Sequence, residues 1–142
     1  MTTETATETA AEAATVRLWA AMQFRDVDAM TAWLRAIGFV EHATYRDDTG
    51  TVVHAEWLWP GGGGIMFGAV RADSPLQPPG SAALYLVSDD PDAVFDAAVA
   101  TGGTVERAMV EQDYGGRGGS VRDPEGNHWS FGSYQPGAEA AG

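Results

Sequence analysis

Two stretches of the chain have apolar residues at helical spacing, and each is bounded by residues that begin and end helices. The first runs from Asp26 to Gly38 and the second from Asp90 to Gly102. An Asp side chain accepts hydrogen bonds from free N–H groups at a helix start, and Gly readily ends a helix. The first stretch has an apolar stripe, formed by Met30, Trp33, Leu34 and Ile37. The pattern predicts two helices, each with one face in a core.

Around each helix, apolar and polar positions alternate as they do in half-buried strands. The alternation predicts strands near 16–24, 39–46, 51–59 and 64–70 in the first half, and near 82–88, 104–110, 117–122 and 127–134 in the second. A hairpin loop is expected at Pro60–Gly64, which lacks the Lys-Ser/Thr pair of a phosphate-binding loop. Each half therefore has one strand, one helix and then three strands.

The two halves are related by a constant offset. When residues 19–68 are aligned with residues 83–132, an offset of 64 positions gives nine identical pairs. The matches fall on helix caps and turns, including Asp26 with Asp90 and Pro60 with Pro124. Such positions fix the course of a backbone, so the offset predicts a duplicated structural unit.

The length and composition are typical of one domain with two short tails. The chain has 142 residues, of which 44% are hydrophobic, enough for one ordinary core. We expect the domain at 16–135, with modules at about 16–70 and 82–134. Residues 1–15 and 136–142 are rich in Thr, Glu, Ala and Gly, and are expected to be disordered.

Composition and charge exclude several classes of function. The chain has no Cys, so thiol chemistry, disulfides and Cys-ligated zinc are excluded. The net charge of −12 repels phosphate backbones, and no nucleic-acid partner is expected. Neither a membrane span nor a signal peptide is recognisable, which predicts a cytoplasmic protein with no membrane partner. The charge favours solubility, and a second interpretation is that it attracts a cationic ligand.

Three motifs in the second half give the chain a resemblance to a known family. They are Ala100-Thr-Gly-Gly103, Tyr114-Gly-Gly-Arg117 and Asp123-Pro-Glu-Gly-Asn-His-Trp129. With the duplicated unit, they make residues 16–134 similar to the vicinal oxygen chelate superfamily of glyoxalases, bleomycin-resistance proteins and extradiol dioxygenases. The resemblance implies an α+β fold of two tandem βαβββ modules forming cupped mixed sheets, usually completed or supported by a homodimer. The cups hold metals in the enzymes and ligands in the binding proteins.

The enzymes of this superfamily carry metal-ligating His or Glu at equivalent strand positions. The resemblance places these positions at Trp19, Met66, Ala83 and Ser130. None of the four is a good ligand for a divalent cation, which prefers carboxylate or imidazole donors. We therefore expect no metal and no other cofactor, as in a ligand-poor, bleomycin-resistance-like branch.

Two functions remain open. The first is a metal-free protein that sequesters a small hydrophobic or aromatic compound, as in antibiotic resistance, with a cation favoured by the acidic charge. The second is a glyoxalase- or dioxygenase-like enzyme, a lyase or an oxidoreductase. It would use a displaced metal site made of His54, Glu56 and His128, or His128 alone as acid or base, for which the sequence shows no orienting partner.

The predicted small-molecule site is an apolar slot with a few polar groups, because Trp and Met offer large polarisable surfaces to planar ligands. Arg117 is expected to border it, with a solvated hairpin charge as the alternative. A shift of one residue in strand facing would put Leu18 and Ala20 on the slot in place of Trp19. The predicted ligand-binding residues are Trp19, Gln23, Met66, Ala83, Tyr85, Arg117, His128 and Ser130.

Overall fold

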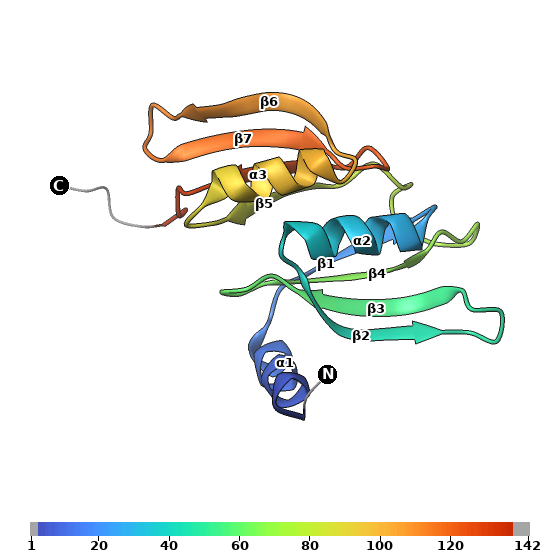
Figure 1. The fold of residues 1–142 in the computed structure, drawn as a ribbon. Coiled ribbons are helices and arrows are strands. Elements are labelled where there is room, and N and C mark those ends of the chain that lie inside the picture. Colours follow the sequence, from blue (N-terminus) through green and yellow to red (C-terminus); the bar gives the residue numbers. More distant parts are fainter. Residues whose placement is uncertain (1–2, 138–142) are drawn as a thin grey trace.

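The protein folds into two βαβββ modules that follow one another along the chain (Figure 1). The computed structural model describes residues 3–137. After helix α1 (Thr3–Thr15), module 1 contains β1 (Trp19–Phe24), α2 (Val27–Ile37), β2 (Val40–Arg46), β3 (Val52–Leu58) and β4 (Gly64–Ala69). Module 2 contains β5 (Ala83–Val87), α3 (Pro91–Ala100), β6 (Thr104–Glu111), β7 (Arg117–Arg122) and β8 (His128–Gly132).

Each module has one four-stranded mixed sheet, and the two sheets have the same topology. Sheet A has the order β1-β4-β3-β2 and sheet B the order β5-β8-β7-β6. The first strand of each is parallel to the last, and the other neighbours are antiparallel. The pair Trp19 and Gly64 in sheet A corresponds to the pair Ala83 and His128 in sheet B, because each residue of the second pair follows its counterpart by 64 positions. The predicted fold class and the duplicated unit are confirmed.

The helix boundaries follow from their capping residues. Asp26 accepts a hydrogen bond from the backbone N–H of Ala29 at 3.1 Å, and Asp90 accepts one from Ala93 at 3.3 Å. Gly38 follows α2 with a φ of 121°, a conformation that a residue with a Cβ rarely adopts. The predicted helix starts and the end of α2 are therefore confirmed.

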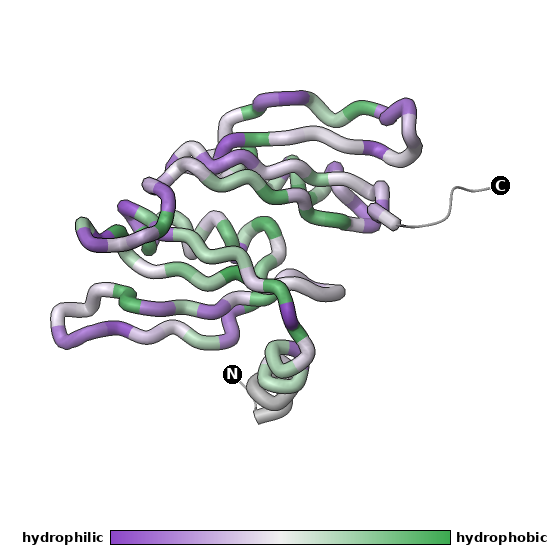
Figure 2. Tube along the Cα trace, turned by 180° about the vertical axis from the view of Figure 1, so that it is seen from behind, coloured by the Kyte–Doolittle hydropathy of each residue, from purple (hydrophilic) through white to green (hydrophobic). Residues whose placement is uncertain are grey.

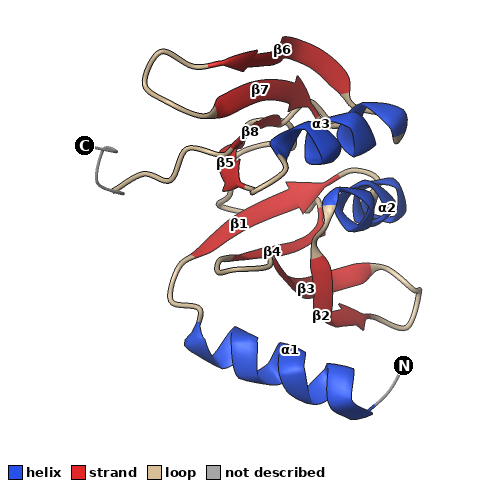
Figure 3. Ribbon diagram, turned by 60° about the vertical axis from the view of Figure 1, so that its left-hand side comes forward, coloured by secondary structure: helices blue, strands red, loops and turns tan. Residues whose placement is uncertain are grey.

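The core lies between the two sheets, where α2 and α3 pack against each other (Figure 3). The fully buried Trp33 of α2 donates a hydrogen bond from Nε1 to the Ala98 carbonyl of α3 at 3.0 Å. Its ring centroid lies 5.4 Å from that of Trp129 on β8. In Figure 2 the hydrophobic positions concentrate at the centre of the molecule. The predicted core face of the first helix, with Met30, Trp33, Leu34 and Ile37, is confirmed, and Trp129 and Phe131 are also fully buried.

The Asp123–Trp129 motif holds its own turn together. The buried Asp123 carboxylate accepts hydrogen bonds from two backbone N–H groups, those of Glu125 and Asn127. It also accepts from Asn127 Nδ2 and Trp129 Nε1, each at 2.8 Å. These bonds satisfy buried polar groups that would otherwise destabilise the fold.

The same turn connects module 2 to module 1. The Glu125 carboxylate accepts hydrogen bonds from the backbone N–H groups of Arg25 and Asp26, at 2.7 and 2.6 Å, at the start of α2. A second connection is the bond from Trp59 Nε1 to the Val87 carbonyl at 3.0 Å. The packing of the modules is therefore fixed by polar as well as apolar contacts.

The N-terminal segment differs from the prediction of a disordered tail over 1–15. It forms α1, which lies along β2 and β3 (Figure 3). Ala and Glu are strong helix formers, and this local preference is enough for a helix in a segment without an apolar stripe. Of the C-terminal tail predicted over 136–142, residues 138–142 lie outside the described residues. No helix within residues 3–137 has the length and hydropathy needed to cross a membrane.

Candidate functional site

Each sheet has one face against α2 and α3, and the opposite face is called the open face, although α1 lies along β2 and β3 on sheet A (Figure 3). The predicted site residues can be placed on these faces by strand register. On sheet A, Met66 pairs with Ala21 on one side and with Glu56 on the other. Directly paired residues point to the same side of a sheet. Trp19 and Gln23 are each two residues from Ala21 along β1, so all three side chains share the open face with Met66.

Trp19 is half-buried and lies flat on the open face of sheet A. Its ring covers Gly64, where a Cβ atom would overlap the indole. Its Nε1 donates to the Val16 carbonyl at 3.3 Å. The remaining ring surface, next to a strand position without a side chain, is a platform on which a planar group can stack.

Gln23 is more enclosed than expected. Its Nε2 donates to the Gln77 carbonyl at 2.9 Å, and its Oε1 accepts from the Arg71 N–H at 3.4 Å. Both polar atoms of its amide are therefore engaged by the loop that follows β4. Beside it is a hollow of about 190 Å³, whose lining includes Met66 and His54.

The open face of sheet B carries the other group of predicted residues. Ser130 pairs with Tyr85 on one side and with Ser120 on the other, and His128 pairs with Ala83 and Arg122. Tyr85 leans over Gly132 and donates a hydrogen bond from its hydroxyl to the Tyr134 carbonyl at 2.6 Å. Removal from water, followed by the neighbouring Tyr114 and Tyr134, raises the Tyr85 pKa.

His128 has an orienting partner that the sequence did not reveal. Its Nδ1 lies 2.6 Å from Glu106 Oε1, and its Nε2 lies 2.7 Å from Ser130 Oγ. Desolvation raises the pKa of Glu106, but the hydrogen bond and charge of His128, together with Arg122, outweigh it and lower the pKa overall. Glu106 lies where the pairing of β6 with β7 shifts register, so simple strand alternation could not place it.

Arg117 differs from the prediction that it borders the pocket. Its guanidinium binds Asp92 in the first turn of α3, with Nε and Nη2 at 2.8 and 2.9 Å from the two carboxylate oxygens. Along β7 it alternates with Ser120, so it lies on the helix side of sheet B. The hydrogen bond from Arg117 is the main reason that the Asp92 pKa is lowered.

The structure does not bring the displaced metal ligands together. His54 Nε2 lies 2.8 Å from Glu56 Oε2 on sheet A, whereas His128 belongs to sheet B. Within residues 3–137 there is no cluster of three or more His, Cys, Asp or Glu side chains that could hold a metal ion. The sequence-based metal site of His54, Glu56 and His128 is therefore not formed within one chain.

The predicted slot is divided between the two sheets for a related reason. Because the helix-bearing faces of both sheets turn toward a common core, their open faces point to opposite sides of the molecule. Trp19, Gln23 and Met66 lie on one side. Ala83, Tyr85, His128 and Ser130 lie on the other. We call these two groups of predicted residues the half-sites.

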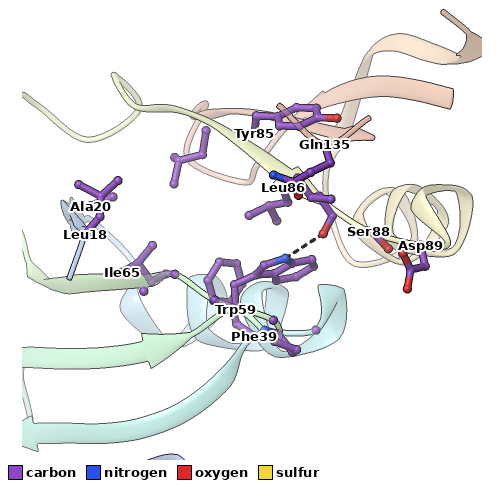
Figure 4. Close-up of a pocket in the computed structure, with 18 of the residues that line it drawn as sticks. Leu18, Ala20, Phe39, Trp59, Ile65, Tyr85, Leu86, Ser88, Asp89 and Gln135 are labelled. Carbon is purple, nitrogen blue, oxygen red and sulfur yellow. Dashed lines mark hydrogen bonds between the residues drawn. The ribbon is translucent and has the colours of Figure 1, made fainter. Parts of the chain in front are cut away.

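A large cavity lies between the modules, beside β1 and β5 (Figure 4). Its volume is about 930 Å³. Leu18, Ala20 and Ile65 form one wall, Leu86 lies across from them, and Trp59 and Phe39 lie below. Ser88 and Asp89 lie at one end, and the lining also includes Leu84, Asp90 and Gln135. Leu18 and Ala20 thus line a cavity on the helix side, while Trp19 stays on the open face.

Comparison with known proteins identifies the family. The model of the Glyoxalase/Bleomycin resistance protein/Dioxygenase superfamily matches residues 17–131, and the chain belongs to this superfamily. Uncharacterized proteins of Mycobacterium bovis and Mycobacterium tuberculosis are each 45% identical to it over 49 residues. That match covers 34% of this chain but only 32% and 29% of the two relatives.

Solved structures share the fold over most of the chain. TioX from Micromonospora sp. ML1 has a TM-score of 0.69 and 24% identity, covering 84% of this chain and 98% of TioX. A bleomycin resistance determinant encoded on the transposon Tn5 has a TM-score of 0.58 and 19% identity, covering 85% and 99%. At these identities the likeness shows the fold alone.

Proposed function

We propose that the protein is a metal-free, homodimeric small-molecule-binding protein that sequesters a planar hydrophobic compound, with a cation preferred. The observation that carries the proposal is the partly exposed Trp19 ring, which lies over Gly64 on the open face of sheet A. Met66, two residues after Gly64 on β4, is on the same face. The family's enzymes keep metal-binding side chains at these positions. An indole and a thioether instead favour stacking and dispersion contacts with an aromatic ligand.

A homodimer would unite the two half-sites. β1 and β5 each stand at the end of their sheet, so each has one edge without a strand partner, a position that favours pairing with another chain. If β1 of one protomer lay beside β5 of its partner with the helices on the same side, the open face of sheet A would adjoin the open face of the partner's sheet B. Trp19 and Met66 would then share a cup with the partner's Tyr85 and Ser130.

Exposed apolar surface beside these edges supports the same arrangement. Leu18, just before β1, is 83% exposed, and the cavity of about 930 Å³ between β1 and β5 has apolar walls. A second copy seated along these edges would cover that surface and remove it from water. The pocket would then belong to the dimer and not to either chain alone.

The dimer is tested by light scattering on the wild type and on Leu18→Glu. The wild type is expected at about twice the 15.0 kDa chain mass, and Leu18→Glu at the mass of one chain, because a carboxylate would be buried in the interface. Val105→Glu is the control, since Val105 is 49% exposed on β6, at the opposite edge of sheet B from β5. A wild-type monomer at every concentration would refute the arrangement.

Ligand binding is tested with two probes of opposite charge, acridine orange and anilinonaphthalene sulfonate, together with a metal analysis of protein purified without chelator. The net charge of −12 should favour the planar cation at low salt and lose this effect at high salt. Quenching of Trp fluorescence and substoichiometric metal are expected. One bound metal ion per chain would contradict the metal-free proposal.

A further inference from the structure

A chain of three hydrogen-bonded side chains crosses the open face of sheet B. The Glu106 carboxylate binds His128 Nδ1 at 2.6 Å, and His128 Nε2 lies 2.7 Å from Ser130 Oγ. The second Glu106 oxygen accepts a hydrogen bond from Arg122 Nε at 2.8 Å. Arg122 therefore fixes the carboxylate while the carboxylate fixes the imidazole.

The order of these groups is the one that activates a hydroxyl. A carboxylate at Nδ1 holds the ring proton on that nitrogen, so the lone pair of Nε2 is directed at the serine oxygen and can take its proton. The side chains of His128 and Glu106 are 31% and 27% exposed. The relay is thus partly shielded from water but reachable from outside.

A further hydroxyl lies next to this relay. Ser120 is directly paired with Ser130 across β7 and β8, and the two side chains point to the same side. The Ser120 side chain is buried, and its Oγ has no hydrogen-bond partner among the described residues. Because this Oγ atom is buried, it offers no contact to a substrate, and the proposal depends on Glu106, His128 and Ser130 alone.

The duplicated fold does not require this arrangement. The positions in module 1 that correspond to Glu106, His128 and Ser130 at the offset of 64 are His42, Gly64 and Met66. Sheet A forms the same strand pairs without any such chain of hydrogen bonds. The relay is therefore a property of the side chains of module 2 and not a consequence of folding.

We propose that Ser130 is an activated nucleophile that accepts acyl groups from small esters, with His128 as general base and Glu106 as positioning residue. Ser130 Oγ attacks the ester carbonyl carbon while its proton passes to His128 Nε2. The carbon–oxygen bond to the alcohol breaks, the alcohol leaves with the proton from Nε2, and an acyl-Ser130 remains. Water attacks this ester by the same proton route, which releases the carboxylic acid and restores Ser130.

The test is covalent labelling by a small fluorophosphonate, read by intact mass and peptide mapping, alongside hydrolysis of p-nitrophenyl acetate. The wild type is expected to take up one label, on Ser130, and Ser130→Ala none. His128→Ala and Glu106→Gln should be labelled about a hundredfold more slowly, the usual contribution of general base catalysis. Circular dichroism of each variant verifies that it is folded.

Ser81→Ala is the matched control, because Ser81 is an exposed serine outside the relay, and its labelling should equal that of the wild type. The proposal is overturned if Ser130 takes up no label in the folded wild type, or if His128→Ala is labelled at the wild-type rate. The readout requires neither a metal nor a planar ligand, so its failure would leave the proposed binding function unaffected.

Discussion

Sheet A and sheet B have the same strand order and equivalent register, but their open faces differ in chemistry. The cross-strand row Ala21, Met66 and Glu56 of sheet A corresponds, at the offset of 64, to Tyr85, Ser130 and Ser120 of sheet B. Sheet A adds the Trp19 ring over Gly64, whereas sheet B adds the hydrogen-bonded pair of His128 and Glu106. The duplicated backbone fixes where side chains point, and the residue types alone decide the chemistry of each open face.

The turns before β4 and β8 are stabilised in different ways, and the variant Asp123→Ala tests this difference. Asp123 accepts from several buried donors, while its counterpart Trp59 precedes three glycines with positive φ, Gly61, Gly62 and Gly63. Removing the carboxylate leaves buried donors unpaired, so the free energy of unfolding should fall by about 3 kcal/mol in urea. Asp48→Ala, in the exposed β2–β3 turn, should change it by less than about 0.5 kcal/mol. Equal effects at both positions would contradict this view of the turn.

The hydrogen bonds that connect the modules at Glu125 should contribute less to stability than those of Asp123. Glu125→Ala removes the acceptor for the Arg25 and Asp26 N–H groups. We expect a loss of about 1–2 kcal/mol of stability in the same urea experiment, since hydrogen bonds to a charged group are of this size. Glu125→Gln keeps one acceptor oxygen and should recover part of the loss. If the alanine variant were as stable as the wild type, the Glu125 hydrogen bonds would not contribute to holding the modules together.

A smaller effect is expected in acid. The lowered pKa values of Glu106 and Asp92 mean that both carboxylates stabilise the folded state above their ordinary values of 4.5 and 3.8. This contribution is lost as pH falls through the lowered folded values, so the melting temperature should drop between about pH 5 and about pH 3. The melting temperature of Glu106→Gln should fall less over that pH interval than the melting temperature of the wild type. An identical pH dependence in the two proteins would show that Glu106 is not coupled to His128.

Local patterns were enough to predict most of the fold. Capping residues, alternation and the offset of 64 locate α2, α3 and all eight strands within a few residues. These features depend on residues that are near in sequence or related by the repeat. The predicted slot, however, combined Trp19 and Met66 with His128 and Ser130, which the structure divides between sheets A and B.

Features that depend on contacts between elements could not be predicted in this way. The separation of the two open faces follows from how Trp33 packs between the helices and β8. The partner of His128 lies at a register shift in β6, and Arg117 is drawn to Asp92 on the helix side. A single sequence carries no periodic signal for any of these contacts.

The measurement that tests the central claim most directly is a fluorescence titration of acridine orange into the wild type, Trp19→Ala and Trp33→Phe. Loss of the stacking surface should weaken binding to Trp19→Ala about ten- to a hundredfold, or about 1–3 kcal/mol. Trp33→Phe alters a fully buried ring in the core, and its affinity should equal that of the wild type. If Trp19→Ala bound the probe as tightly as the wild type, the open face of sheet A would not be the ligand site.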